Sequence, residues 1–321
     1  MVKKLVGIDV GGTSVKFAIV SLTGEIEQKW TIKTNIADAG SHIVPDIAKS
    51  LNNKLLELAI EKDNIVGIGM GTPGSINYTN GTVVNAFNLN WTTVQPVSAT
   101  LTELTGLPVY LDNDANVAAL GEGWQGAGDG ESEVVFVTLG TGVGGGVITN
   151  GKIVRGIAGA GGEIGHVTVE RDGIACTCGK KGCLETIASA TGVLNVARQQ
   201  APSSKANSTL RDDLLLNNSV SAKAVFDAAK AYDPFAQEVV AYVAQSLGFA
   251  LSHIGNLLNP SRIVIGGGVS AAGDVLIEPV RDEFEKNVFS TVKQSTKIAV
   301  ATLGNDAGVI GAASLVLAEQ N

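Results

Sequence analysis

One arrangement of residues occurs twice in this chain and limits the folds that it can adopt. At residues 5–24, an apolar run is followed by a loop of glycine and threonine, a second apolar run and a tight turn. The same order of features returns at residues 134–151, where the turn is Asn150-Gly151. Short apolar runs joined by glycine turns are typical of antiparallel strands. A repeat of this kind predicts two related domains.

The residues after each repeat are expected to form further strands and helices. Apolar side chains at helical spacing predict a helix from Ile43 to Leu58, and Pro45 fits there if it lies in the first turn. Strands that alternate with helices predict an α/β fold. The other predicted strands cover residues 26–32, 65–70, 109–111, 262–265 and 298–303, and the other predicted helices cover 115–120, most of 187–258 and the residues from a cap at Asn305-Asp306 to about 318.

Composition excludes several classes of protein. With 321 residues, the chain is long enough for roughly two domains of about 150 residues each. Hydrophobic residues make up 45% and charged residues 17%, which excludes a disordered chain. The net charge of −8 argues against binding to nucleic acid or to an anionic membrane. No apolar run approaches the ~18 residues of a membrane helix, and the first residues are expected to form a strand and not a signal peptide.

The two loops of glycine and threonine are candidate anion sites. They contain Gly11-Gly12-Thr13 and Gly140-Thr141-Gly142. Glycines let backbone N–H groups turn toward an anion, and a threonine hydroxyl adds a donor. Asp9 ends the first predicted strand, a position where a carboxylate would suit hydrated Mg²⁺. Neither loop matches the Walker A pattern or the dinucleotide-binding pattern in the right context, so a Rossmann dehydrogenase is disfavoured.

All three cysteines lie in one short segment, at Cys176, Cys178 and Cys183. Three cysteines cannot form a paired disulfide framework, so we expect a reduced, cytoplasmic location. Together with His166, the nearest histidine, they form a Cys₃His set that matches a closed, structural zinc site. The alternative is a group of buried thiols without metal, and the glycines at 179 and 182 favour the zinc site over it.

The pair Asn113-Asp114 stands where a predicted strand ends and a helix begins. From these residues alone, an ordinary helix cap is the favoured interpretation. A functional interpretation is also chemically coherent. A carboxylate can accept a proton from a hydroxyl, an asparagine can both donate and accept hydrogen bonds, and a helix N-terminus would keep Asp114 ionised.

Three segments carry a resemblance to a known family. Asp9-Val-Gly-Gly-Thr-Ser-Val-Lys16 resembles the first phosphate loop of the actin-like, hexokinase-type ATPase superfamily. Leu139-Gly-Thr-Gly-Val-Gly-Gly-Gly146, continued by Gly156, Gly162, Gly165 and His166, resembles the signature of the ROK family of repressors, open reading frames and sugar kinases. The segment from Cys176 to Glu185 is similar to the zinc-binding segment of that family. The resemblance covers nearly the whole chain and is strongest to the bacterial ROK glucokinases.

The resemblance implies a fold and a reaction. The fold would be α/β, with two RNase H-like domains flanking a cleft. The smaller N-terminal domain would comprise residues 1–112 plus 304–321, and the larger C-terminal domain would comprise residues 113–303, with the zinc segment at 166–183. The reaction would be transfer of the γ-phosphoryl group of ATP to a hexose, above all to the 6-hydroxyl of glucose, with a place in glycolysis. Mg²⁺ would sit on the phosphates, and the protein would be a dimer or tetramer.

The resemblance also assigns site residues. Asp114 would be the general base, and His166 would bind both the sugar and, with Cys176, Cys178 and Cys183, the zinc ion. The other residues expected to contact or line the sugar are Asn113, Glu163, Glu185, Gly74 and Asn88. The residues expected to bind the nucleotide are Asp9, Gly11, Gly12, Thr13, Lys16, Gly140, Thr141, Gly142, Gly144, Gly267 and Gly268.

Two alternatives stay open at this point. A kinase for another hexose, such as N-acetylmannosamine, would use the same five sugar-facing residues, which are Asn113, Asp114, Glu163, His166 and Glu185. The phosphoryl donor could be ATP or polyphosphate. A non-catalytic ROK sugar sensor or repressor is disfavoured, because the phosphate loop begins at Asp9 and leaves no room for a preceding DNA-binding motif. The net charge of −8 argues in the same direction.

Overall fold

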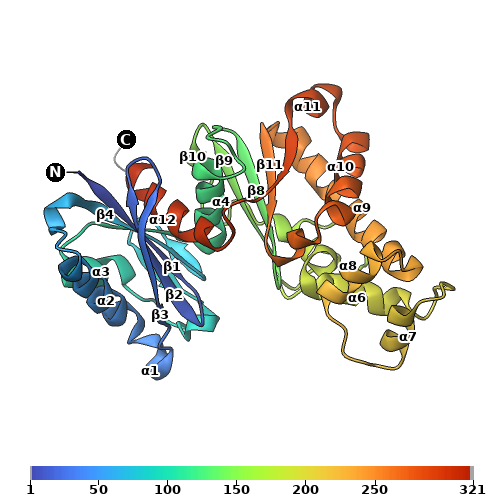
Figure 1. Cartoon of the computed structure of the whole chain (residues 1–321), viewed down its shortest axis with the longest axis horizontal. Helices are drawn as coiled ribbons and strands as arrows, with labels where there is room; N and C mark the ends of the chain where they lie inside the picture. The colour runs from blue at the N-terminus through green and yellow to red at the C-terminus, as the bar shows by residue number, and fades with distance from the viewer. Residues whose placement is uncertain (1, 319–321) are drawn as a thin grey trace. The chain divides into compact units, whose positions relative to one another are not determined.

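The computed structural model describes residues 2–318, which form two compact units. The first unit comprises the chain up to Ser132, Gly146–Gly161 and the residues from Leu303 onward. The second unit comprises Glu133–Gly145 and Gly162–Thr302. Strands and helices alternate along the chain in both units (Figure 1). The α/β fold expected from the sequence is confirmed.

The strands are short, and most of them follow the expected apolar runs. They are β1 (Lys4–Val10), β2 (Ser14–Ser21), β3 (Ile26–Lys33), β4 (Ile65–Thr72), β5 (Ser75–Asn77), β6 (Thr82–Val84), β7 (Val109–Asn113), β8 (Val134–Leu139), β9 (Val143–Thr149), β10 (Lys152–Ile153), β11 (Arg262–Gly266) and β12 (Lys297–Val300). The expected turn between β9 and β10 is confirmed, because Asn150 and Gly151 both have positive φ, at 50° and 71°. Such a pair suits the two-residue hairpin turn that asparagine and glycine favour.

The helices fill most of the remaining chain. They are α1 (Ala37–Gly40), α2 (Ile43–Glu57), α3 (Val97–Thr105), α4 (Asp114–Gln125), α5 (Glu185–Ala188), α6 (Ala190–Gln200), α7 (Thr209–Leu215), α8 (Ala222–Lys230), α9 (Pro234–Leu258), α10 (Asp274–Asn287), α11 (Ser290–Ser295) and α12 (Ala307–Ala318), with 3₁₀ helices η1 (Lys62–Asn64), η2 (Phe87–Leu89), η3 (Ile164–His166), η4 (Gly268–Ala272) and η5 (Gly304–Asp306). Pro45 lies in the first turn of α2, as expected. Within residues 2–318, no helix combines the length and the apolar character needed to span a bilayer.

The repeat in the sequence corresponds to a repeat of whole sheets. The first five-stranded sheet has the order β3-β2-β1-β4-β7, and the second has the order β10-β9-β8-β11-β12. Strands β1, β4 and β7 run parallel, as do β8, β11 and β12. The pairs β2–β3 and β9–β10 are antiparallel. Each sheet therefore has an antiparallel edge beside three parallel strands.

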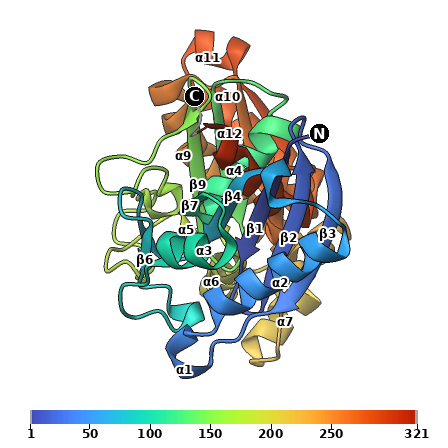
Figure 2. The same cartoon turned by 90° about the vertical axis from the view of Figure 1, so that its left-hand side faces the viewer.

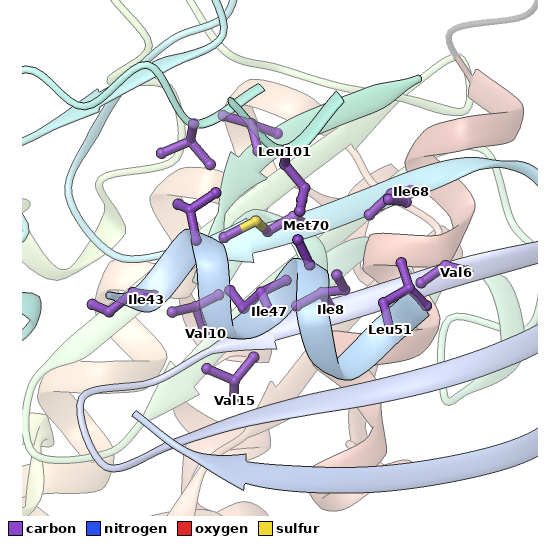
Figure 3. Close-up of a cluster of buried hydrophobic side chains, with 14 of the residues drawn as sticks. Val6, Ile8, Val10, Val15, Ile43, Ile47, Leu51, Ile68, Met70 and Leu101 are labelled. Carbon is purple, nitrogen blue, oxygen red and sulfur yellow. The ribbon is translucent and has the colours of Figure 1, made fainter. Parts of the chain in front are cut away.

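The first sheet is covered by helices on both faces. Successive side chains of a strand point to opposite sides. Ile8 of β1 therefore joins Ile47 of α2 and Leu101 of α3 in one apolar cluster (Figure 3), while Leu5 joins Val309 of α12 in another. Figure 2 shows α2 and α3 lying over the near face of this sheet.

Helix α12 approaches the first sheet very closely because glycines occupy the contact positions. A methyl group on Gly7 would lie 1.9 Å from the carbonyl oxygen of Val309, and one on Gly69 would lie 1.6 Å from that of Ala312. Both distances are far inside van der Waals contact, so a larger residue would push the helix away. Helix α12 also packs along α4. This packing is why the first unit continues beyond residue 112, the domain boundary expected from the sequence.

The chain differs from the sequence-based expectation near residue 300. The strand expected over residues 298–303 ends at Val300, because the chain then turns into η5, which begins at Gly304 with φ of 54°. Asp306, expected to help cap the last helix, accepts hydrogen bonds from Nζ of Lys29 at 3.1 and 2.9 Å. Its carboxylate thus joins β3 to the start of α12.

A buried carboxylate fixes the point where the chain returns to the first unit. Glu122 of α4 is fully buried. Its Oε2 accepts a hydrogen bond from the backbone N–H of Ala127 at 2.9 Å, and its Oε1 accepts one from that of Leu303 at 2.8 Å. A buried carboxylate is tolerated only when such donors replace water. Glu122 therefore ties the end of α4 to the segment that leads into α12.

We expect Glu122→Gln to lower the free energy of unfolding by about 2 kcal/mol. Glutamine has one acceptor oxygen, so its NH₂ group would face one of the two backbone N–H donors and leave that donor unsatisfied. Chemical denaturation of the purified variant measures this loss. Glu61→Gln, a change at an exposed position, is the matched control, and an equal effect of both changes would contradict a special role for Glu122.

Candidate active site

The predicted site residues of the first unit gather at one edge of its sheet. The carboxyl ends of parallel strands meet at the same edge, where ligands commonly bind in open α/β sheets. Asp9 of β1 is in register with Gly71 of β4, and Gly71 is in register with Asp112 of β7. Asn113 and Asp114 follow immediately. The structure thus places Asp9, just before the first Gly/Thr loop, and the predicted general base at the same edge of the sheet, with β4 between their strands.

The first Gly/Thr loop is a tight connection between β1 and β2. The N–H of Gly11 donates to the carbonyl of Ser14 at 2.9 Å, and the hydroxyl of Thr34 donates to the carbonyl of Gly11 at 2.6 Å. Lys16 and Asp9 form an ion pair at 3.4 Å. The ion pair therefore places a cation and a carboxylate side by side next to this loop.

Asn88 lies against this loop. A methyl group on Gly12 would be 3.0 Å from the carbonyl oxygen of Asn88. The segment that precedes it begins at Gly74, whose φ of 100° is in a region that favours glycine. This segment includes the short hairpin β5–β6, which the sequence did not predict. Gly74 and Asn88 thus stand at the two ends of one segment beside the first phosphate loop.

Asn113 and Asp114 form the N-terminus of α4. Oδ1 of Asn113 accepts a hydrogen bond from the N–H of Ala115 at 2.9 Å, and Oδ1 of Asp114 accepts from the same group at 2.8 Å. Asn113 is therefore the N-cap of the helix, which is the interpretation favoured from these two residues alone.

The surroundings of Asp114 disfavour its charged form. Desolvation by the surrounding protein is the largest influence and raises the pKa of Asp114 above 3.8, and the negative charge of Asp9 raises it further. The hydrogen bonds from Ala115 and Asn113 lower the pKa but do not outweigh desolvation. The helix N-terminus therefore does not by itself set the protonation of Asp114, in contrast to the sequence-based expectation. A raised pKa makes the carboxylate a better proton acceptor.

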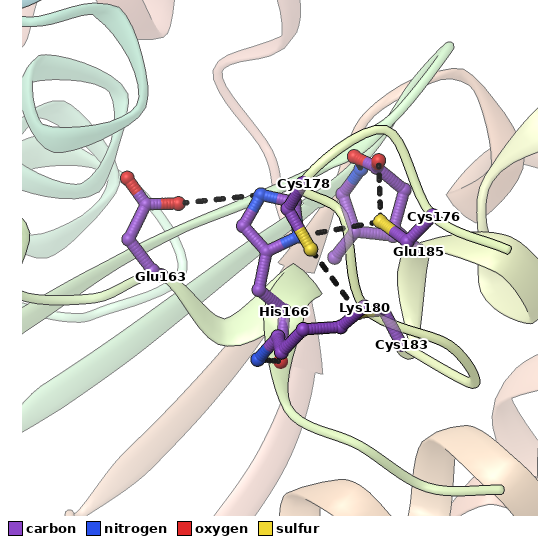
Figure 4. A network of polar contacts seen from close by, with 8 residues as sticks. Glu163, His166, Cys176, Cys178, Lys180, Cys183 and Glu185 are labelled. Atoms are coloured by element: carbon purple, nitrogen blue, oxygen red, sulfur yellow. Dashed lines mark hydrogen bonds and ion pairs between the residues drawn. The ribbon is translucent and has the colours of Figure 1, made fainter.

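In the second unit, the four predicted zinc ligands converge (Figure 4). The ligand atoms of His166, Cys176, Cys178 and Cys183 all lie within 4.8 Å of one another. The Sγ atoms of Cys178 and Cys183 are 3.6 Å apart, and Nδ1 of His166 is 3.7 Å from Sγ of Cys176. A tetrahedral zinc ion with Zn–S bonds of about 2.3 Å needs sulfur atoms about 3.8 Å apart. The donor set and its spacing therefore fit zinc.

The other nitrogen of His166 points away from the cysteines. Nε2 lies 3.9 Å from Oε2 of Glu163, which is exposed (Figure 4). A histidine that binds a metal through one nitrogen is held in one tautomer, and its other nitrogen is then a hydrogen-bond donor. The dual role of His166 in binding sugar and zinc stays a prediction. Burial also raises the pKa of the Cys183 thiol to about 12.

Glu185 connects the zinc ligands to the second Gly/Thr loop. Its Oε1 is 3.8 Å from Sγ of Cys176, and its Oε2 accepts a hydrogen bond from the N–H of Val143 at 3.1 Å. Two further bonds follow: the N–H of Ala190 donates to the carbonyl of Gly140 at 2.8 Å, and the hydroxyl of Thr191 donates to that of Thr141 at 3.1 Å. The segment after the cysteines therefore fixes the conformation of the phosphate loop.

A cavity opens beside the second Gly/Thr loop. Its volume is about 650 Å³, within the usual range for small-molecule sites. Gly140, Thr141 and Gly268 line it, together with residues that the sequence did not single out. Those residues include Lys223, Phe226, Asp227 and Lys230 of α8 and Val269. An apolar pocket rimmed by lysines beside a glycine loop suits a planar base with attached phosphates.

The sequence profile of the ROK family matches residues 5–319 of this chain. The chain belongs to the ROK family. The glucokinase of Halalkalibacterium halodurans is 48% identical over 317 residues, which cover 98% of this chain and 96% of that protein. The resemblance drawn from the sequence motifs is confirmed.

Solved ROK structures share the fold. The ROK hexokinase from Thermus thermophilus has a TM-score of 0.82 at 30% identity, and the match covers 99% of each chain. The ROK family glucokinase from Streptomyces griseus, solved in complex with glucose and AMPPNP, has a TM-score of 0.74 at 32% identity. That match covers 99% of this chain and 100% of the other.

The predicted site residues of this ROK protein form two groups. The first unit carries Asp9, Gly11, Gly12, Thr13, Lys16, Gly74, Asn88, Asn113 and Asp114, and the second carries Gly140, Thr141, Gly142, Gly144, Glu163, His166, Cys176, Cys178, Cys183, Glu185, Gly267 and Gly268. The residues of α8 escaped the sequence analysis because an amphipathic helix without a motif gives no signal of a ligand. Gly267 packs against Leu139, since a methyl group there would be 2.5 Å from the Leu139 carbonyl oxygen.

Proposed function

We propose that this ROK protein is an ATP-dependent glucokinase that transfers the γ-phosphoryl group of ATP to the 6-hydroxyl of glucose, with Asp114 as general base. The observation that carries this proposal is the 48% identity over nearly the full length to a glucokinase. The similar Streptomyces griseus glucokinase was solved with glucose and AMPPNP. The polar ends of β1, β4 and β7, with Asp114 on α4, supply residues suited to this reaction.

The chain's own residues can perform each task that phosphoryl transfer requires. The carboxylate of Asp114 accepts the proton of the attacking hydroxyl as the new O–P bond forms and the bond to ADP breaks. Backbone N–H groups of the two Gly/Thr loops and the ammonium of Lys16 stabilise the phosphate oxygens. Asn113, Glu163 and His166 would orient the sugar through its other hydroxyls.

Two metal ions would fit these residues. Asp9 offers a partly exposed carboxylate at the end of β1, which suits a hydrated Mg²⁺ ion bound to ATP, and Mg²⁺ would neutralise charge on the phosphates. Zinc would bind His166, Cys176, Cys178 and Cys183, whose spacing fits its tetrahedral geometry. The four protein ligands fill the zinc shell, so zinc would be structural and would fix the orientation of the His166 ring.

The proposal is tested by a substrate panel in a coupled ADP assay. We expect kcat/KM for glucose with ATP to exceed that for mannose and N-acetylmannosamine, and the product to be glucose 6-phosphate by NMR. A higher kcat/KM for N-acetylmannosamine than for glucose would identify N-acetylmannosamine as the substrate. Turnover with polyphosphate in place of ATP would revise the donor, and binding of sugar without any turnover would support a sensor instead of an enzyme.

The raised pKa of Asp114 predicts the acid limb of the pH dependence of kcat. A general base acts only as the carboxylate, so kcat falls as the pH drops through the pKa of Asp114 and the side chain takes up a proton. Because this pKa lies above 3.8, the loss begins at a higher pH than for an ordinary aspartate. Initial rates at saturating glucose and MgATP, from neutral to acidic pH, measure the limb.

The pH experiment needs a control for unfolding. Activity should return in full when the enzyme is brought back to neutral pH after each acidic incubation. A reversible kcat that stays flat down to the ordinary carboxyl range of about pH 4 would contradict a raised pKa for the base.

A further inference from the structure

We propose that Asp112 is a positioning residue for the sugar half of this kinase: its buried carboxylate holds the start of α4, the β5–β6 hairpin and the loop after β10 in one arrangement. The inference rests on the proposed function, since it assigns Asp112 a role in orienting Asn113 and Asp114 toward a hexose. Neither the phosphoryl transfer nor the sugar contacts described above use Asp112 itself. All the groups involved belong to the first unit.

The carboxylate of Asp112 is fully buried, yet it is surrounded by donors. Oδ1 accepts hydrogen bonds from the N–H of Asn113 at 2.8 Å, from Nδ2 of Asn116 at 2.7 Å and from the hydroxyl of Tyr78 at 3.2 Å. Oδ2 accepts one from Nε of Arg155 at 2.8 Å. A buried charge is stable only with such partners, so the four donors and the carboxylate fix one another.

Two of these hydrogen bonds connect Asp112 to the first turn of α4. Asn113 precedes the helix and Asn116 lies within it, so both are anchored to the same carboxylate oxygen while Asp114 stands between them. The direction in which Asp114 projects is therefore set by the position of Asp112 at the end of β7. Displacement of a catalytic group by about 1 Å can cost on the order of 10²-fold in rate.

Tyr78 connects the segment from Gly74 to Asn88 to the carboxylate of Asp112. It directly follows β5, and its hydroxyl donates to Asp112. Burial and the charge of Asp112 raise the pKa of Tyr78 far above its usual value, so the hydroxyl keeps its proton and remains a donor. The hydrogen bond therefore holds the segment whose two ends are Gly74 and Asn88, both expected to line the sugar.

Arg155 connects the loop after β10 to Asp112. Its guanidinium pairs with Asp112 and lies over the Tyr78 ring, 4.7 Å from the ring centre. The same loop returns to Tyr78 at Gly159, where a methyl group would be 3.0 Å from Cε2 of the ring. The N–H of Gly161 donates to the carbonyl of Arg155 at 2.9 Å and closes the loop. Glu163, an expected sugar ligand, follows two residues later in the sequence.

The test is Asp112→Asn, which keeps the shape of the side chain and removes its charge. In asparagine, an NH₂ group replaces one carboxylate oxygen. In one orientation of the amide this NH₂ group faces the guanidinium of Arg155, and in the other it faces the three groups that donate to Oδ1. We expect kcat to fall by at least about tenfold and the KM for glucose to rise by a similar factor. The KM for ATP should stay within about twofold, because the four donors to Asp112 described above lie outside both Gly/Thr loops. Asp63→Asn, an exposed change in the same unit, should alter none of these values.

If Asp112→Asn does not fold, Arg155→Lys provides a second test. Arg155→Lys retains the positive charge but loses the planar group that reaches Asp112 and covers Tyr78, and it should give the same split between glucose and ATP at a smaller size. A folded Asp112→Asn with unchanged kcat and KM for glucose would overturn the proposal. So would equal losses for glucose and ATP in either variant, because a general structural defect affects both substrates.

A failed role for Asp112 can be distinguished from a failure of the proposed function. Wild-type turnover on the sugar panel settles the substrate first. If another hexose is preferred, glucose fails as the substrate, and the same split between that hexose and ATP still supports or overturns the role of Asp112. If the wild-type protein turns over no hexose, its sugar affinity by calorimetry takes the place of KM, and Asp112→Asn should weaken that affinity by about tenfold.

Discussion

Asp114→Ala will reduce kcat for glucose phosphorylation by about 10²–10⁴-fold, the usual contribution of a general base. Without the carboxylate, the 6-hydroxyl keeps its proton as it attacks the γ-phosphorus, and the barrier rises. Asp114 makes its hydrogen bonds with Ala115 next to it, and Asn113 still caps α4, so the fold should persist. Steady-state kinetics in the coupled assay measure the loss in kcat.

Substrate binding separates this loss from a structural defect. Calorimetry should show that Asp114→Ala and Asp114→Asn bind glucose and AMPPNP within about tenfold of the wild-type affinities. The exposed change Asp63→Asn controls for loss of one negative charge. Near-normal turnover in both Asp114 variants would refute the assignment of the base.

We expect Cys178→Ser to abolish the proposed zinc binding and to lower the melting temperature of the protein. Binding of a structural zinc ion contributes on the order of 10 kcal/mol in small zinc domains, and a serine hydroxyl is a poor replacement for a thiolate ligand. Metal analysis should find one zinc ion per wild-type chain and much less in the variant, with a lower melting temperature. Thr177→Ser, between two ligands but exposed, should change neither value.

We expect Cys178→Ser to raise the KM for ATP more than a substitution far from the cysteine segment would. Glu185 follows the cysteines and accepts the N–H of Val143, and Ala190 and Thr191 hold Gly140 and Thr141. Loosening of the cysteine segment therefore loosens the second Gly/Thr loop, and we expect the KM for ATP to rise. A zinc-free wild-type protein with full activity and an unchanged melting temperature would contradict the structural role of the metal.

The sequence predicted the fold well because its signals were local and were repeated. Alternating apolar runs and glycine turns specify β1–β3 and β8–β10, and the repeat implies that the strands which follow join in the same order. The parallel neighbours β4, β7, β11 and β12 then complete sheets of equal topology. The hairpin β5–β6 was missed, since its strands have only three residues each.

The candidate site was predictable only where residues form motifs. The cysteine segment and the two Gly/Thr loops carry recognisable spacing, and the zinc ligands do converge. Asp112, Tyr78 and Arg155 come from three separate segments, and nothing in their spacing shows that they meet. The same holds for Phe226 and Lys230 of α8, which reach the cavity only through tertiary packing. Desolvation and the charge of Asp9 raise the pKa of Asp114, and a helix-cap argument includes neither influence.

The most direct test of the account is a crystal structure with glucose and AMPPNP bound. It should place a carboxylate oxygen of Asp114 about 2.6–3.2 Å from the sugar's 6-hydroxyl, with that hydroxyl in line with the γ-phosphorus and Nε2 of His166 on another hydroxyl of the same ring. A complex in which Asp114 faces solvent, with glucose bound elsewhere, would contradict the central claim.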